Sequence, residues 1–231
     1  MSEYLLSTSG LTKQFGHHKA VNNVDLHVKK GAIYGFIGRN GAGKTTFLKM
    51  ISGLSKPTDG EIQMFGYRNE ELKNVRSRIS CLIEAPGIYG NMSAYHNLAI
   101  KCRLFGINDS KYIENILKIV GLSEVGKKKT KHFSLGMKQR LGIGLALVGE
   151  PDLLVLDEPI NGLDPQGIAE IRDMLLRLKE EQNMTIIISS HILEELSKIA
   201  THYGIIHNGS LIQELTREEL MTRCSERMEL T

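Results

Sequence analysis

The sequence predicts an α/β protein with a mostly parallel sheet, because short apolar segments alternate with amphipathic helices along much of the chain. Segments 33–37, 153–156 and 185–189 are apolar and have the length of fully buried strands. Strands that alternate with helices form parallel sheets that are covered on both faces. The 231 residues are enough to bury the core of one such domain.

The first part of the chain is predicted to contain a half-buried strand, a buried strand and a helix, in that order. Val24, Leu26 and Val28 alternate with polar residues, which is the period of a strand with one exposed face. Gly31 supplies a turn before the apolar strand 33–37. After a glycine-rich segment, four apolar residues stand at helical spacing: Phe47, Leu48, Met50 and Ile51.

The middle of the chain has a different pattern. Residues 93–121 and 133–148 are expected to be helical, so we interpret roughly 90–150 as a helical insertion between two halves of the sheet domain. The densest basic run, 127–131, is predicted to be a solvated surface loop. No aromatic residues are interleaved with it and the net charge is only +3, which disfavours a nucleic-acid partner.

The last part of the chain is predicted to hold two more helices and a hairpin. Apolar spacing indicates helices over 168–178 and 192–200. Asn208-Gly209 stands between two apolar runs, which is a hairpin signal. Thr216 and Glu219 have the spacing of a helix capping box.

A complete phosphate-loop pattern, G-x-x-x-x-G-K-T, runs from Gly38 to Thr45. Its glycines allow backbone N–H groups to surround a phosphate, and the following helix directs its positive end to the same place. A lysine supplies a point charge, and a threonine hydroxyl suits Mg²⁺. A chance match is disfavoured because the strand and the helix stand where the mechanism needs them. The predicted nucleotide-binding residues here are Gly38, Asn40, Gly41, Gly43, Lys44, Thr45 and Thr46.

Acidic and imidazole side chains follow two of the predicted buried strands. Asp157 and Glu158 end the strand 153–156, where Asp157 is expected to hold Mg²⁺ and Glu158 to act as general base toward water. A pair that caps a neighbouring helix is the alternative, and the phosphate loop favours the catalytic interpretation. His191 follows the strand 185–190 and is predicted to reach the γ-phosphate, the alternative being a structural hydrogen bond.

Together these motifs resemble the nucleotide-binding subunit of ATP-binding cassette (ABC) transporters, in the family's own order along nearly the whole chain. Gly38–Thr45 is similar to its Walker A loop, and the segment 153–158 to its Walker B strand. His191 resembles its switch histidine. Phe15 stands where the family has the aromatic residue that stacks on adenine, with a packing role on the first hairpin as the alternative. The resemblance therefore implies ATP as the nucleotide, and an ATPase activity.

Two further motifs complete the resemblance and imply a homodimer. Ser134, Gly136 and Met137 stand in the family's signature segment, and Asp164 in its D-loop. The resemblance implies that two copies associate head to tail around two ATP molecules, each signature facing the partner's Walker A loop. It also implies a single domain over 1–231, with an N-terminal antiparallel β subdomain. Its catalytic core would be 1–89 and 151–231, and its helical subdomain 90–150.

The sequence departs from the family pattern at three positions. Leu135 and Met137 replace a glycine and a glutamine of the signature. Glu84 stands where the family has a glutamine, and we expect it to act as a catalytic residue and as a ligand of Mg²⁺. A surface glutamate is the alternative, since an ionised carboxylate accepts hydrogen bonds but cannot donate one.

Glu84 followed by Ala85-Pro86, with the altered signature, resembles the family's bacitracin-export and lantibiotic-immunity branch. The resemblance implies an ATPase that drives a separate permease from the cytoplasmic side of the cell membrane and expels an antimicrobial peptide. Pro86 and Tyr89 would line the groove that receives the permease. The alternatives are a soluble cassette ATPase acting on DNA or ribosomes, and a regulatory module. The soluble ATPase is disfavoured because the chain lacks a coiled coil and a second cassette. The regulatory module is disfavoured because Glu158 and His191 are present.

Overall fold

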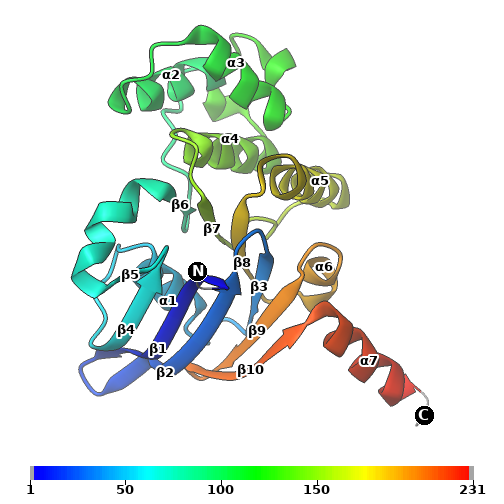
Figure 1. Ribbon diagram of the computed structural model, residues 1–231. Coiled ribbons are helices and arrows are strands. Elements are labelled where there is room, and N and C mark those ends of the chain that lie inside the picture. Colours follow the sequence, from blue (N-terminus) through cyan, green and yellow to red (C-terminus); the bar gives the residue numbers. More distant parts are fainter. Residues whose placement is uncertain (1–2, 229–231) are drawn as a thin grey trace.

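The computed structural model describes residues 3–228, and its strands form two sheets (Figure 1). The larger sheet has the order β10-β9-β3-β8-β7-β6, and every pair in it is parallel except β9 with β10. This confirms the predicted mostly parallel sheet. Its strands are β3 (Ile33–Ile37), β6 (Ile79–Leu82), β7 (Leu153–Asp157), β8 (Thr185–Ser190), β9 (His202–His207) and β10 (Ser210–Thr216).

The smaller sheet is antiparallel and has the order β2-β1-β4-β5. Its strands are β1 (Tyr4–Phe15), β2 (His18–Lys29), β4 (Asp59–Met64) and β5 (Tyr67–Arg68). Helix α1 (Lys44–Ile51) packs between the two sheets, because Phe47 and Met50 share one buried cluster with residues of β1 and β2 and with Val155 of β7 and Ile187 of β8. The antiparallel sheet therefore fixes the position of the helix that follows the phosphate loop.

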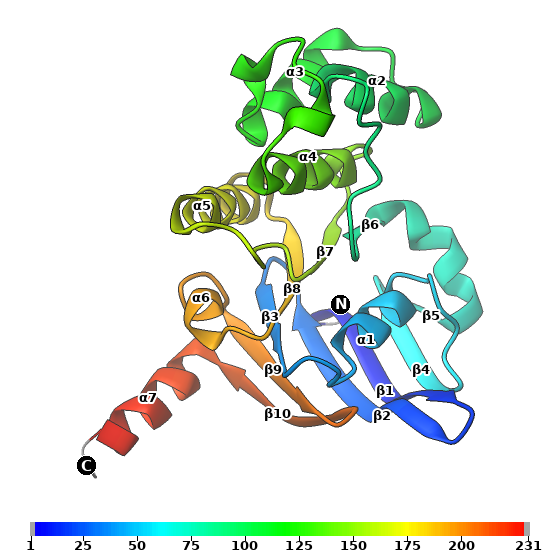
Figure 2. The same cartoon turned by 180° about the vertical axis from the view of Figure 1, so that it is seen from behind.

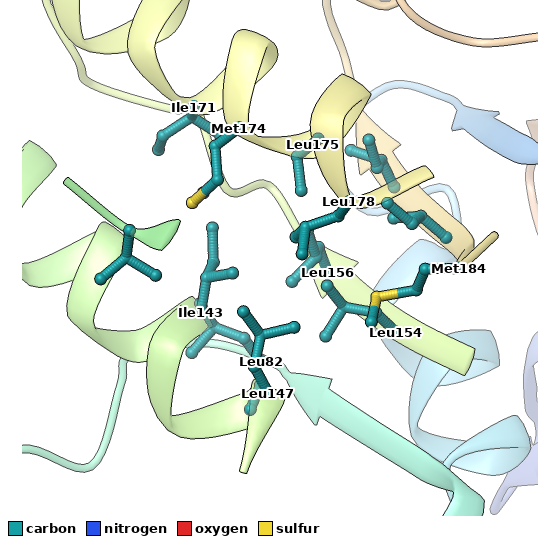
Figure 3. Close-up of a cluster of buried hydrophobic side chains, with 14 of the residues drawn as sticks. Leu82, Ile143, Leu147, Leu154, Leu156, Ile171, Met174, Leu175, Leu178 and Met184 are labelled. Carbon is teal, nitrogen blue, oxygen red and sulfur yellow. The ribbon is translucent and has the colours of Figure 1, made fainter. Parts of the chain in front are cut away.

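The central strands divide their side chains between two hydrophobic clusters. On β7, Leu153 and Val155 join the cluster around α1, whereas Leu154 and Leu156 face the other cluster. This is the period-2 alternation of a strand that is buried on both faces. Figure 3 shows the second cluster, in which helices α4 (Leu135–Leu147) and α5 (Pro165–Gln182) cover the strands.

The remaining helices surround this frame (Figures 1 and 2). Helix α2 and helix α3 lie above α4, on the side away from α1. Short 3₁₀ segments connect several of the elements. The bounds are α2 (Ala94–Leu104), α3 (Ser110–Ile119), α6 (Leu193–Ser197) and α7 (Arg217–Met228), with 3₁₀ segments η1 (Asn69–Arg78), η2 (Ser123–Val125) and η3 (Thr130–His132).

Two helix predictions need correction. The segment 93–121 is not continuously helical, because Gly106 takes a left-handed φ of 74° and Asp109 starts α3 by accepting from Lys111 N at 2.8 Å. The predicted helix over 192–200 is shorter, because α6 ends at Ser197. Soon after it, Thr201 N donates to Ile33 O at 2.8 Å, and the chain joins the sheet.

The predicted C-terminal hairpin and capping box are confirmed. β9 and β10 pair antiparallel around Asn208 and Gly209, both of which have positive φ. Thr216 N donates to Glu219 Oε2 at 2.7 Å, and Glu219 N donates to Thr216 Oγ1 at 3.3 Å. These two reciprocal hydrogen bonds cap the N-terminus of α7.

Candidate functional site

The phosphate loop connects the carboxyl end of β3 to the first residue of α1. Arg39, Asn40 and Gly41 are exposed at its tip. Gly41 and Gly43 have left-handed φ angles of 79° and 104°, which glycine adopts without steric cost. The loop thus presents backbone and a helix N-terminus to solvent, which is a geometry that receives phosphate.

Distant parts of the chain hold the loop in place. Gly38 N donates to Ser190 O at 3.3 Å, and Gly209 N donates to Ala42 O at 2.9 Å. A Cβ atom at Gly43 would overlap the carbonyl oxygen of Ala20. This glycine is therefore required for close packing as well as for its φ angle.

Lys44 lies under the loop and is almost fully buried, with 6% of its surface exposed. Its Nζ donates to Gly38 O at 2.6 Å and to Arg39 O at 3.3 Å. The same Nζ lies 3.1 Å from the buried Glu158 Oε1, at ion-pair distance but without hydrogen-bond geometry. Lys44 therefore links the phosphate loop to the acidic end of β7.

The acidic end of β7 is the centre of a continuous polar network. Thr45 Oγ1 donates to Asp157 Oδ2 at 2.7 Å, and Ser189 Oγ donates to Asp157 Oδ1 at 2.5 Å. Ser189 Oγ also accepts from Glu158 N at 2.9 Å. Glu158 Oε2 lies 2.9 Å from His191 Nδ1. Five side chains, which come from α1 and from the carboxyl ends of β7 and β8, are thereby linked beside Lys44.

Ser189 is a member of this network that was not predicted from the sequence. It is fully buried and connects Asp157 to the backbone of Glu158. The available signal was the pair Ser189-Ser190, which ends a strand whose preceding residues, Ile186–Ile188, are apolar. A polar pair at the carboxyl end of a buried strand, next to a phosphate loop, points to a site.

Glu84 leaves the sheet at the same edge as Glu158. Leu82 of β6 is paired with Leu156 of β7, and each glutamate stands two residues beyond its leucine. Both glutamates have positive φ, 64° for Glu84 and 48° for Glu158. The Glu84 carboxylate, however, pairs with Lys49 Nζ at 2.5 Å and not with the Asp157 network.

Phe15 ends β1 and is 55% exposed. Lys13 Nζ lies 5.1 Å from the centroid of its ring. The ring is therefore accessible to a ligand, and its contact with adenine stays a prediction.

The signature residues lie at the N-terminus of α4. Ser134 caps this helix by accepting from Met137 N at 3.2 Å. Asp164 caps α5 in the same way, accepting from Gly167 N at 3.2 Å. Both views of the fold place α4 apart from α1, the helix that follows the phosphate loop (Figures 1 and 2).

Comparison with known proteins identifies the family. A family model described as ABC transporter matches residues 21–161, which is more than half of the chain. The chain belongs to the ABC transporter family. It is an ATP-binding cassette, and ATP hydrolysis is the activity of this family.

Two curated relatives are similar to this cassette along almost its whole length. The bacitracin transport ATP-binding protein BcrA of Bacillus licheniformis is 48% identical over 222 residues, covering 95% of this chain and 72% of that protein. The lantibiotic transport ATP-binding protein SrtF of Streptococcus pyogenes is 43% identical over 210 residues, covering 91% of this chain and 90% of that protein.

Solved cassettes have the same fold. The structure of cbiO1 from Clostridium perfringens, described as part of the ABC transporter complex cbiONQ, matches with a TM-score of 0.86 at 26% identity. It covers 96% of this chain and 92% of that one. An ATP-binding cassette solved in its ADP conformation matches with a TM-score of 0.84 at 27% identity, covering 96% and 94%.

A groove of about 300 Å³ lies between the sheet and the helices of the cassette. Pro86 and Tyr89 line it, together with residues of β6, α2 and α4. Tyr89 is 58% exposed, whereas its backbone is held because Tyr89 N donates to Asn97 Oδ1 at 2.8 Å. The groove therefore presents an accessible aromatic side chain on a hydrogen-bonded backbone.

Within residues 3–228 of the cassette, none of the helices combines the length and the apolar content that crossing a bilayer requires. In the same part of the chain, no group of three or more His, Cys, Asp or Glu side chains is placed so that it could hold a metal ion. Thr45 and Asp157 nevertheless place two oxygen donors together. That donor set fits Mg²⁺, which takes few protein ligands and keeps several waters.

Replacing Ser189 with alanine is expected to lower kcat about tenfold or more, with a smaller change in KM for ATP. The substitution removes the hydroxyl that links Asp157 to Glu158 N and leaves both groups with one partner fewer. Steady-state ATP hydrolysis measures the effect. Ser190→Ala is the matched control, because Ser190 is equally buried but accepts from Ile192 N. Equal losses in the two variants would contradict a specific role for Ser189.

Proposed function

We propose that this cassette is the ATPase subunit of an exporter that protects a cell from antimicrobial peptides of the bacitracin or lantibiotic class. The observation that carries the proposal is the 48% identity to a bacitracin transport protein over 95% of the chain. Glu84 and the signature residues Leu135 and Met137 support it, since they are the departures that pointed to this branch.

The phosphate loop is proposed to bind the triphosphate of ATP through Gly38, Asn40, Gly41, Gly43 and Thr46, with Phe15 against the adenine. Lys44 supplies positive charge to the β- and γ-phosphates. Thr45 and Asp157 would hold Mg²⁺, which neutralises charge on the phosphate oxygens when it is bound. Glu84 is the further metal-ligand and catalytic candidate, and its carboxylate would first have to leave Lys49.

Glu158 is proposed to accept the proton of the attacking water. Its carboxylate stands beside Asp157 and lies 2.9 Å from His191 Nδ1. His191 therefore orients the base, and Ser189 fixes the backbone that carries it. This arrangement of a base and its orienting partner favours hydrolysis over a module that only binds ATP.

ATP is proposed to join two copies head to tail. Ser134, Gly136 and Met137 stand at a helix N-terminus, where N–H groups and the helix dipole favour a phosphate. Because α4 lies apart from α1 in one chain, the phosphate that these residues would bind belongs to the partner's site. Asp164, which caps α5, would hold the D-loop against the same interface.

The groove lined by Pro86 and Tyr89 is proposed to receive a helix of a separate permease. That partner would bring residues 1–231 to the cytoplasmic face of the cell membrane as one cassette. In it, residues 1–89 and 151–231 form the catalytic core and residues 90–150 the helical subdomain. Nucleic acid is not among the proposed partners.

Loss of the gene from its host tests this function directly. We expect the deletion strain to become more sensitive to bacitracin or to a lantibiotic. The wild-type gene should restore resistance and a Glu158→Gln copy should not. An antibiotic that is not a peptide serves as the control. Unchanged sensitivity to both peptide classes would contradict the proposal, even if the purified chain hydrolyses ATP.

Replacing Tyr89 with alanine is expected to weaken co-purification with the permease roughly tenfold or more, because exposed aromatic residues are frequent anchors of interfaces. ATP hydrolysis by the isolated chain serves as the folding check. Tyr67→Ala is the matched control, since Tyr67 is 41% exposed but lies on β5. Equal co-purification of the two variants would show that the groove is not the contact.

A further inference from the structure

The Glu84 carboxylate and the Lys49 ammonium form an ion pair at 2.5 Å between the end of β6 and helix α1. Neither partner is deeply buried, because 67% of the Glu84 side chain and 37% of the Lys49 side chain are exposed. Glu84 also has a left-handed φ of 64°, which is uncommon outside glycine. The pair therefore connects a residue with a left-handed backbone, Glu84, to α1, the helix that follows the phosphate loop.

Lys49 lies on the same face of α1 as the predicted metal ligand Thr45. The two residues are four apart in one helix, and such residues lie one above the other. One helical turn advances about 5.4 Å along the axis. Thr45 Oγ1 in turn donates to Asp157 Oδ2. The residue that holds the Glu84 carboxylate thus stands one helical turn after Thr45, which contacts Asp157.

We infer that Lys49 is a positioning residue for Glu84, which it neutralises and holds beside the nucleotide site. The inference rests on the proposed function, in which the phosphate loop binds ATP and Glu84 is a metal-ligand candidate. A carboxylate at this place repels a triphosphate, and the ammonium of Lys49 offsets that repulsion. An exposed ion pair adds little to folding stability, so the pair can open without disturbing the helix.

The segment that carries Glu84 also reaches α4. A Cβ atom at Gly142 would lie 2.7 Å from Pro86 Cβ, so this part of α4 fits closely against the residues after Glu84. Pro86 is also a wall of the groove proposed for the permease. The segment 84–86 therefore contacts both helix α1, through Glu84, and the groove, through Pro86.

Binding of a fluorescent ATP analogue to the full chain, at low salt and with Mg²⁺ chelated, tests the inference without requiring hydrolysis. We expect Lys49→Gln to weaken binding roughly two- to fivefold, which is the size of effect that an exposed charge pair produces. Adding Glu84→Gln to the same chain should restore the affinity, because it removes the unpaired carboxylate. Lys49→Arg should retain it, and high salt should shrink the difference.

The Lys29–Glu3 pair provides the control, because its partners are 42% and 63% exposed and it lies at the end of β2, away from the loop. Lys29→Gln should leave the affinity unchanged. If Lys49→Gln has no effect, or if Glu84→Gln does not restore the affinity, Lys49 does not act through Glu84. If the unmodified chain fails to bind the analogue at all, the proposed function fails, and this inference fails with it.

Discussion

Replacing Glu158 with glutamine is expected to lower the rate of ATP hydrolysis by roughly 10²–10⁴-fold, the usual contribution of a general base. Glutamine has nearly the same shape as glutamate but cannot take a proton from water at neutral pH. The residues that contact phosphate, Lys44 and Thr45 among them, remain in place. The variant should therefore still bind ATP and accumulate as an ATP-bound dimer. Single-turnover hydrolysis and light scattering with ATP measure the two effects.

Glu150→Gln is a suitable control for this experiment. Glu150 precedes β7 as Glu158 follows it, and both have left-handed φ angles, 53° and 48°. The control variant should hydrolyse ATP normally and show no trapped dimer. A Glu158→Gln variant that binds ATP yet stays monomeric would contradict the head-to-tail dimer.

Replacing Gly43 with alanine is expected to lower the free energy of unfolding by about 2–5 kcal/mol and to abolish nucleotide binding. A left-handed backbone costs an L-residue about 1–2 kcal/mol, and overpacking adds about 1–3 kcal/mol. Both apply here, because φ is 104° and the new Cβ atom would overlap Ala20 O. Denaturant unfolding without nucleotide measures the first effect, and equilibrium binding of a fluorescent ATP analogue the second.

Gly41→Ala separates the two causes of this instability. Gly41 has a φ of 79°, but no atom lies within 4 Å of a Cβ atom placed there. In its alanine variant, backbone strain alone should lower the free energy of unfolding, by about 1–2 kcal/mol. Equal destabilisation of the two variants would show that the contact with Ala20 contributes nothing.

The parts of the fold that local pattern determines were predictable from the sequence. The apolar strands β3, β7 and β8, the phosphate loop and the capping box at Thr216 all follow from residues close together in the chain. Strand β4 and segment η1 were not predicted, because only Ile62 and Met64 of β4 are buried and 3₁₀ geometry has no strong apolar period.

The predicted site residues differ in how far the structure brings them together. Asp157 and Glu158 were predictable because a strand end beside a phosphate loop has a fixed place in a parallel sheet. The contact of Glu84 with Lys49 was not, since it depends on the φ angle of one residue and on where α1 lies against β6. The bridging hydroxyl of Ser189 likewise depends on the lateral order of β7 and β8. Such contacts join residues that are distant in the sequence, so a local sequence pattern does not predict them.

The anchoring of the phosphate loop has a consequence for how the protein is made. The loop rests on Ala20 near the start of the chain and on Gly209 near its end, and Asn22 N also donates to Gly209 O at 2.8 Å. Domains form during synthesis from the N-terminus, and contacts between distant residues come late. A nascent chain that has not yet emerged through the β9–β10 turn carries the entire loop sequence without its support. We therefore expect the chain to bind nucleotide only after the β9–β10 turn, which lies far beyond the loop in the sequence, has left the ribosome.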